Sequence, residues 1–276
     1  MIELPEASLI ARQIRTELAG KHIASAMRGN TPHKFAFYSR SPEEYAEILK
    51  GRRMGTAYDL GSLIIANVEP DYALMLGFGG ERILYHESES SLPKKHHLLL
   101  HFEGDTYLSV TVQGWGFAQL WLQSEVLDQP CCGHGKPSPL SENFTLEYFD
   151  SLFGELEPED PRSVKLFMIS KPGILGIGNG YLQDILFRAR LHPRHRVREL
   201  SQTGKQDLYT ATRETIQQAL ALDGRDTEFD LHNRPGRYQR IMDNRSVGKP
   251  CPTCGTPIEK AQYLGGAVYY CPSCQK

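Results

Sequence analysis

Apolar side chains recur at helical spacing near the start of the chain. One stripe contains Ala7, Ile10, Ala11, Ile14 and Leu18, which is the pattern of an amphipathic helix with one buried face. Proline and glutamate are typical of a first helical turn, and glycine is common just after a helix ends. The ELPE segment and Gly20 supply these signals, so we predict a helix within the first 21 residues.

Between residues 34 and 122 the pattern changes to short apolar runs with strand-like composition. Gly, Asp, Pro or Ser separate these runs, which read KFAFYS, SLIIANV, YALMLGF, ERILYH, HHLLLHF, TYLSVTV and FAQLWL. Many short strands in succession favour an antiparallel sandwich or barrel. We therefore expect an N-terminal β domain over residues 1–123.

Helical spacing returns after a Pro- and Gly-rich segment at residues 124–141, which we interpret as a linker. Helices are expected at residues 164–169, 181–190 and 205–222, together with an earlier one for which Ser141 is the expected cap. The chain is therefore predicted to be a multidomain α/β protein of the α+β kind. Its parts are the β domain, the linker, a helical domain at 142–245 and a terminal module at 246–276.

Composition places the chain among ordinary globular proteins, with 40% hydrophobic and 23% charged residues. The formal net charge is −2, so any surface that attracts a polyanion must be local. A basic cluster does occur, formed by Arg188, Arg190, Arg194, Arg196 and Arg198. With no leader pattern and no apolar run approaching ~18 residues, we expect a cytoplasmic protein without membrane insertion.

The terminal module carries the strongest chemical motif. Cys251, Cys254, Cys271 and Cys274 have the spacing C-x2-C-x16-C-x2-C, which is typical of one closed, structural zinc ion held by four thiolates. Two disulfides or an iron–sulfur cluster are the alternatives. Cys131, Cys132 and His134 are not predicted to bind metal, because adjacent cysteines share ligand geometry poorly.

A glycine-dense turn precedes the helix expected at 181–190. Gly173, Gly176, Gly178 and Gly180 surround Asn179, and such a turn lets a ligand approach the backbone closely. The first N–H groups of a helix form an anion site, so phosphate is the expected ligand. The alternative is a tight connection between two packed helices, in which Asn179 only caps the second helix.

Three of these stretches together resemble the formamidopyrimidine-DNA glycosylase and endonuclease VIII family. They are IELPEASLIARQI, GIGNGYLQDILFRARLHP and CPTCGTPIEKAQYLGGAVYYCPSCQ, and they occur in the family's order. The resemblance implies a β-sandwich, a helix–two-turn–helix domain and a zinc hairpin. It also implies DNA contacts at Gly178, Asn179, Tyr181, Arg188, Arg190, Arg52 and Arg53, and a void-filling role beside a flipped-out base for Phe78 and Trp115.

The chain departs from the family pattern where that family performs chemistry or holds the lesion. Ile2 occupies the position of the nucleophilic proline, and Gly55, or Thr56 with a one-residue shift, that of the active-site lysine. Gly114 and Gly266 replace two arginines that contact the orphaned base and the DNA phosphates. Glu3 is retained at the position of the family's proton-handling carboxylate.

We therefore expect a monomeric DNA-binding protein of the bacterial cytoplasm or nucleoid, which recognises double-stranded DNA that is damaged, abasic or distorted. Its imine-based chemistry is expected to be altered or lost, with Ile2 inert. The alternative is an active DNA glycosylase or AP lyase that uses Glu3 or the Met1 amine. A protein-interaction module built on the zinc hairpin is a further alternative.

Overall fold

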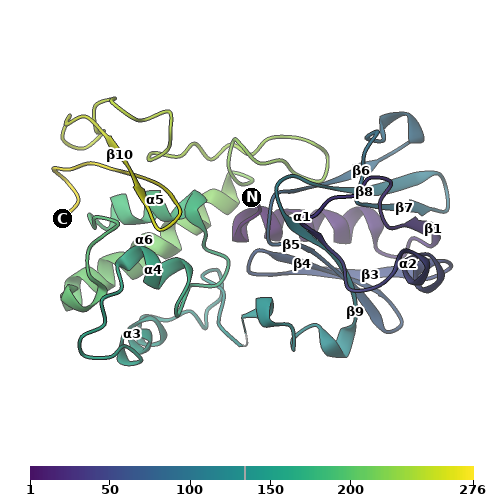
Figure 1. Cartoon of the computed structure of the whole chain (residues 1–276), viewed down its shortest axis with the longest axis horizontal. Coiled ribbons are helices and arrows are strands. Elements are labelled where there is room, and N and C mark those ends of the chain that lie inside the picture. The colour runs from purple at the N-terminus through teal and green to yellow at the C-terminus, as the bar shows by residue number, and fades with distance from the viewer. Residues whose placement is uncertain (134) are drawn as a thin grey trace. The chain divides into compact units, whose positions relative to one another are not determined.

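The computed structural model describes residues 1–133 and 135–276. The chain forms two compact units (Figure 1). Unit 1 consists of Met1–Gly135 and Leu222–Arg237, and unit 2 of Lys136–Ala221 and Tyr238–Lys276. Residues 222–237 thus pack with the N-terminal unit, whereas the sequence placed them in the helical domain. The four-part division drawn from the sequence stays a prediction.

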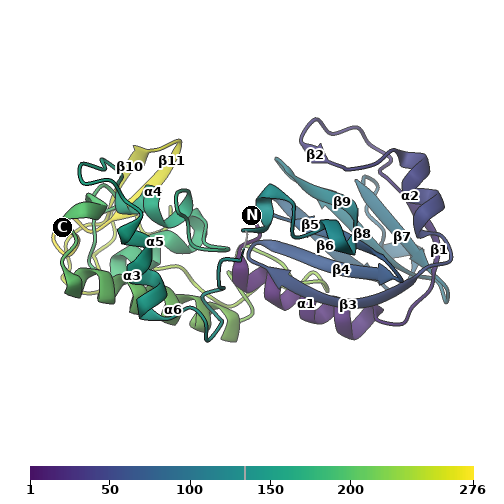
Figure 2. The ribbon, with the colours of Figure 1, turned by 90° about the horizontal axis from the view of Figure 1, so that it is seen from below.

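Unit 1 contains two β-sheets. One has the strand order β1-β7-β8-β6 and the other β2-β9-β5-β4-β3. The strands are β1 (Ile23–Met27), β2 (Ala36–Phe37), β3 (Arg53–Leu60), β4 (Leu63–Glu69), β5 (Tyr72–Gly77), β6 (Glu81–His86), β7 (Leu98–Phe102), β8 (Thr106–Val112) and β9 (Gly116–Leu122). All pairs are antiparallel except β2 with β9, which is parallel and places the short β2 at a sheet edge (Figure 2).

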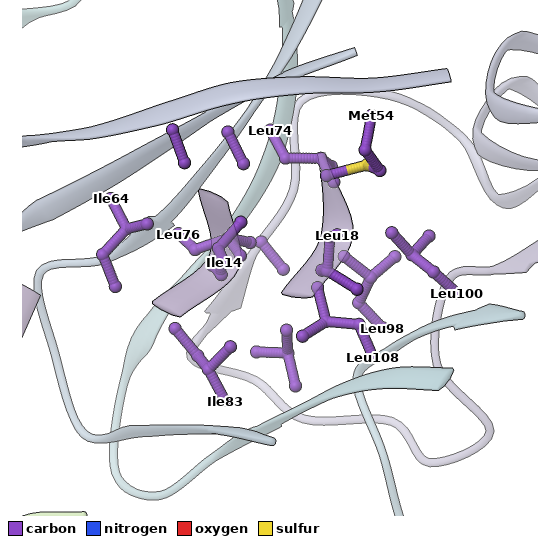
Figure 3. Close-up of a cluster of buried hydrophobic side chains, with 14 of the residues drawn as sticks. Ile14, Leu18, Met54, Ile64, Leu74, Leu76, Ile83, Leu98, Leu100 and Leu108 are labelled. Carbon is purple, nitrogen blue, oxygen red and sulfur yellow. The ribbon is translucent and has the colours of Figure 1, made fainter. Parts of the chain in front are cut away.

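Helix α1 (Leu4–Leu18) contributes its apolar stripe to the core of unit 1. Figure 3 shows Ile14 and Leu18 between Leu74 of one sheet and Leu98 of the other. A capping box between Glu3 and the first helical turn fixes where α1 begins. The predicted helix and sandwich are both confirmed, and a shorter helix, α2 (Pro42–Leu49), follows β2.

Unit 2 is helical and ends in a hairpin. Its elements are α3 (Leu146–Gly154), α4 (Val164–Ile169), α5 (Asn179–Arg188), α6 (Gln202–Ala221), β10 (Glu259–Tyr263) and β11 (Gly266–Tyr270). The cap expected at Ser141 is wrong, because Thr145 occupies the N-cap of α3 and accepts a hydrogen bond from the Tyr148 N–H. Buried Asp184 of α5 fixes the loop before the hairpin by accepting hydrogen bonds from the N–H groups of Ile241 and Met242.

A buried ion cluster joins residues 222–237 to the N-terminal segment of unit 1. The Arg225 guanidinium lies 3.2 Å from a Glu3 carboxylate oxygen and 3.0 Å from each Glu6 carboxylate oxygen. It also donates to the Met1 carbonyl at 2.5 Å. The side chains of Arg225 and Glu3 are only 4% and 1% exposed. Removing one partner of such a cluster leaves an uncompensated buried charge.

We expect Arg225→Met to lower the free energy of unfolding by about 3–5 kcal/mol, because two buried carboxylates lose their cation. The matched control is Arg12→Met, which removes an exposed guanidinium 3.9 Å from Asp223 and costs at most about 1 kcal/mol. Urea unfolding of both variants measures the difference. Equal, small effects would show that the cluster does not hold this segment.

Candidate functional site

The glycine turn of unit 2 connects α4 to α5. Gly173 and Gly176 have φ values of +75° and +73°. Residues other than glycine rarely adopt this backbone conformation. Gly178 is the N-cap of α5 and Asn179 its first residue. Asn179 is therefore not the cap expected under the structural alternative, and its side chain lies at the N-terminal end of the helix.

Asn179 also belongs to a hydrogen-bonded link between the turn and the hairpin. The Gln183 side-chain amide donates to Asn179 Oδ1 at 3.2 Å, and Gln183 Oε1 accepts from the Tyr269 N–H at 3.3 Å. A Cβ atom built on Gly266 would lie 2.8 Å from Asn179 Nδ2. Because that separation is too short for real atoms, Gly266 is the residue that lets Asn179 lie against the hairpin.

Lys165 of α4 is a member of this site that sequence reasoning missed. Its side chain is fully buried, and Nζ donates to the Tyr263 carbonyl of the hairpin at 2.9 Å. Burial lowers the pKa of the Lys165 ammonium. The signal in the sequence was a single lysine inside the apolar helix VKLFMI. Turn, hairpin and lysine therefore form one polar cluster within unit 2.

The basic cluster begins at the last residue of α5 and is at the surface of unit 2. Its members are all exposed, as a phosphate-contacting role requires; they are Arg188, Arg190, Arg194, Arg196 and Arg198. Arg188 donates to the Gln218 side chain at 2.6 Å, which orients its guanidinium on α6. The five exposed guanidinium groups thus add local positive charge to unit 2, although the net charge of the chain is −2.

The expectation for Tyr181 is corrected. Its side chain is fully buried, with its ring centroid 5.5 Å from that of Tyr238. A buried ring supports α5 from inside and offers no side-chain surface to DNA.

The four cysteines of the terminal module lie together. Their sulfur atoms are all within 4.8 Å of one another, with Cys251 and Cys274 separated by 3.8 Å and Cys254 and Cys271 by 3.5 Å. Tetrahedral zinc with Zn–S bonds of about 2.3 Å requires sulfur separations of about 3.8 Å. These distances fit a single metal ion and are too long for disulfide bonds.

The N-terminal segment of unit 1 is buried where the family places its nucleophile. Ile2 is 3% exposed, and its N–H donates to the Gly79 carbonyl at 2.8 Å. Glu3 is paired with Arg225, and the Met1 amino group lies 2.6 Å from Glu228 Oε1. Both groups proposed for the enzymatic alternative are therefore engaged in ion pairs.

Gly55 and Gly114 differ in the space that a side chain would find at each position. A Cβ on Gly55 would lie 3.0 Å from Glu69 Oε1, so a side chain there is crowded. Gly114 has a φ of +83°, and in the part of the chain that the structure describes a Cβ there meets no atom within 4 Å. A side chain at 114 thus has space but a strained backbone.

Phe78 and Trp115 lie on adjoining loops of unit 1, as the void-filling expectation requires. Their ring centroids are 5.5 Å apart, and Trp115 is 38% exposed. Glu81 holds both loops, because its carboxylate accepts from the Gly79 N–H at 3.0 Å and from the Phe117 N–H at 2.6 Å. Burial raises the pKa of Glu81 to about 8, against the effect of those hydrogen bonds.

Arg52 and Arg53, expected to contact DNA, have acidic partners. Arg52 lies 2.5 Å from Asp71 and 4.6 Å from the centroid of the Tyr72 ring, and Arg53 is paired with Glu69. Paired guanidinium groups present less positive charge to a phosphate, so these two residues are weaker candidates than the exposed cluster in unit 2.

Two other expectations bear on the site. Cys131 is half-buried and Cys132 buried, whereas His134 lies outside the described residues. In the described residues, no helix is both long enough and apolar enough to cross a membrane.

Known proteins are similar to this chain over nearly its whole length. The N-terminal domain model of formamidopyrimidine-DNA glycosylase matches residues 1–113, and the H2TH domain model of the same enzyme matches residues 136–230. A formamidopyrimidine-DNA glycosylase of Bacillus cereus is 26% identical over 100% of this chain and 99% of its own length. One from Roseiflexus sp. is 29% identical over the full length of both chains.

Solved structures agree on the fold. The Lactococcus lactis enzyme in complex with DNA containing an abasic site superimposes with a TM-score of 0.86 at 22% identity, covering 99% of both chains. A mutant of that enzyme in complex with DNA containing Fapy-dG gives the same values. Since both domain models match and the relatives align from end to end, the chain belongs to the formamidopyrimidine-DNA glycosylase and endonuclease VIII family.

Proposed function

We propose that this protein binds DNA that is damaged, abasic or distorted, and that the imine-based chemistry of its family is altered or lost in it. The observation that carries the proposal is the buried Arg225 cluster. It holds the Met1 carbonyl, Glu3 and Glu6 together, while the Ile2 nitrogen is directed at the Gly79 carbonyl. With Met1 in place, the Ile2 nitrogen is a peptide nitrogen without a nucleophilic lone pair, and the α-amine of Met1 is one residue away from the position of the family's nucleophile.

The polar cluster of unit 2 supports the DNA-binding part of the proposal. Asn179 lies at the N-terminal end of α5, where backbone N–H groups and the helix dipole favour an anion. The exposed arginines at the end of α5 and beyond it add positive charge without base-specific geometry. Such contacts position a protein on the DNA backbone and do not select sequence. Known complexes of relatives with damaged DNA point to the same class of ligand.

The loss of chemistry is supported by how the substituted positions fit their surroundings. Gly55 is crowded by Glu69, Gly114 is held at positive φ, and Gly266 lies against Asn179. Restoring the family's side chain at any of these sites requires a neighbour or the backbone to move. Gly55 and Gly266 are thus part of this chain's packing, whereas Gly114 meets a backbone requirement.

A second candidate function is lyase activity through the Met1 amine, and one observation favours it. That amine lies beside Glu228, at a hollow of about 110 Å³ that Glu81 and Gln113 also line. A carboxylate at 2.6 Å is within reach for proton transfer. The same ion pair must break before the amine attacks, so we rank this function second.

The terminal cysteines are proposed to hold one structural zinc ion. Four thiolates close the coordination sphere, which leaves no position for a substrate. The metal would fix the hairpin that carries Gly266 and Tyr263, and through them Asn179 and Lys165.

One zinc per chain is expected by metal analysis of the purified protein, because the metal and the hairpin fold together. Cys254→Ser should release the zinc and weaken DNA binding by disordering the hairpin beside Asn179. The matched control Cys131→Ser should leave metal content and DNA affinity unchanged. Substoichiometric zinc in the wild type, or two disulfides found by mass, would contradict the proposal.

Changing both Arg188 and Arg190 to Ala should weaken binding to all duplex sequences alike and reduce the salt slope by about 2, since each lost phosphate contact removes about 1. Asn179→Ala should likewise weaken binding without changing sequence preference. Lys50→Ala, an exposed cation in unit 1, serves as the control. Fluorescence anisotropy between about 50 and 200 mM salt measures the slope. Wild-type affinity in these variants would show that the glycine turn only connects two helices and does not bind DNA.

Ile2→Pro should also allow removal of Met1, which frees the secondary amine of the proline. Combined with Gly55→Lys it should accelerate strand cleavage at abasic sites by roughly 100-fold or more over the wild type, because a positioned acid–base group alone contributes that much. Gly55→Ala controls for crowding by Glu69 without adding an ammonium. Single-turnover cleavage of an abasic duplex measures the rates. Wild-type cleavage as fast as that of an active family enzyme would refute the loss, and Glu3→Gln would then show whether Glu3 carries the reaction.

A further inference from the structure

Unit 1 exposes a group of large aromatic side chains around the edge strand β2. Phe35 and Phe37 are 48% and 41% exposed, and Trp115 is 38% exposed. With Phe117, Gly114 and Gln119 they line an open hollow of about 780 Å³. We call these four aromatic residues the aromatic surface. Single exposed apolar side chains are common on protein surfaces, but a contiguous group of them often marks a binding site.

Ring-to-ring contacts hold the aromatic surface in place. The Phe37 and Phe117 ring centroids are 5.8 Å apart, as the parallel pairing of β2 with β9 requires. Phe78 stacks on Phe117 at 5.3 Å with an interplanar angle of 23°. Flat rings that are already ordered lose little entropy when another flat ring stacks on them.

Residues 28–34, which we call the basic segment, adjoin β2. A second hollow of about 760 Å³ is lined by the basic segment together with Ala36, Tyr38 and Pro42. Phe35 and Phe37 do not line it; they line the first hollow. Lys34 Nζ is 5.4 Å from the centroid of the Phe35 ring. Residues 18–42 contain no Asp or Glu, although the whole chain has a net charge of −2. Aromatic rings and cations thus adjoin in the segment that leads into β2.

We propose that the aromatic surface and the basic segment bind a run of unpaired bases in single-stranded DNA. Bases would stack on Phe35, Phe37 and Trp115, and backbone phosphates would lie along Arg28 and Lys34. Paired bases present only their edges in the grooves, so stacking on these rings requires an unpaired strand. The inference rests on the proposed function as a DNA-binding protein, and it names a ligand class beyond a single orphaned base.

A second copy of this chain is the competing occupant. In a symmetric dimer the same patch meets itself, which would bring two acid-free basic segments close together and make the contact unfavourable. A single-stranded polyanion with exposed ring faces matches both the aromatic and the basic character. The surface is therefore assigned to nucleic acid.

Fluorescence anisotropy with a labelled oligo(dT) strand tests the proposal on the full chain. Phe35→Ala and Phe37→Ala should each weaken binding by about 5- to 150-fold, the range measured for loss of one stacked base. Leu127→Ala, which removes a side chain that is 60% exposed and lies outside the aromatic surface, should have no effect. Wild-type affinity in both Phe variants would overturn the assignment.

Tryptophan fluorescence gives an independent readout. The chain has two tryptophans, so Trp121→Phe leaves Trp115 as the only reporter, and oligo(dT) should quench its emission. An unquenched Trp115 at saturating oligo(dT), or a wild-type dimer in sedimentation that Phe37→Ala dissociates, would instead contradict the proposal.

Asn179→Ala separates this inference from the proposed function. It should weaken binding to an abasic duplex and leave oligo(dT) affinity unchanged. Binding of the duplex without binding of oligo(dT) would overturn the single-strand inference alone. Binding of oligo(dT) without any preference for the abasic duplex would overturn the proposed function and leave this inference standing.

Discussion

The buried contact of Arg225 with Glu3 and Glu6 determines the geometry of the N-terminal segment in unit 1. One guanidinium reaches both carboxylates and the Met1 carbonyl. Burying charges is tolerable only when each is paired and hydrogen-bonded, so the segment has little freedom to take another position. The cluster pairs Glu3 and Glu6, and it acts together with the capping box that begins α1 and with the hydrogen bond from the Ile2 N–H to Gly79.

In unit 2, the comparable constraint is the close approach of the hairpin to α5. Gly266 has no side chain, and Asn179 occupies the space that a Cβ would need. Lys165 donates to the hairpin from α4, and the cysteine cluster closes the far end of the same module. The groups that would contact phosphate are thus held by packing that differs from the family pattern at position 266.

Much of the fold was predictable because it is written in local patterns. The stripe from Ala7 to Leu18 predicted α1, and the cysteine spacing predicted that the four cysteines lie together. Contacts between distant residues were not predictable. The residues around Arg225 do not indicate that its partner is Glu3, which is 222 residues away. A single lysine in α4 likewise does not indicate a hydrogen bond to Tyr263. Only part of the aromatic surface was predicted from the sequence. Trp115 was identified, but the exposure of Phe35 and Phe37 depends on the pairing of β2 with β9.

The central claim is that DNA binding persists while imine chemistry is altered or lost. Borohydride reduction in the presence of abasic-site DNA tests it most directly, because reduction converts any imine into a stable covalent adduct whose position mass spectrometry can map. We predict that the wild-type protein binds this DNA and forms no adduct above the level of a control protein. A stoichiometric adduct mapped to the N-terminal residue would contradict the account.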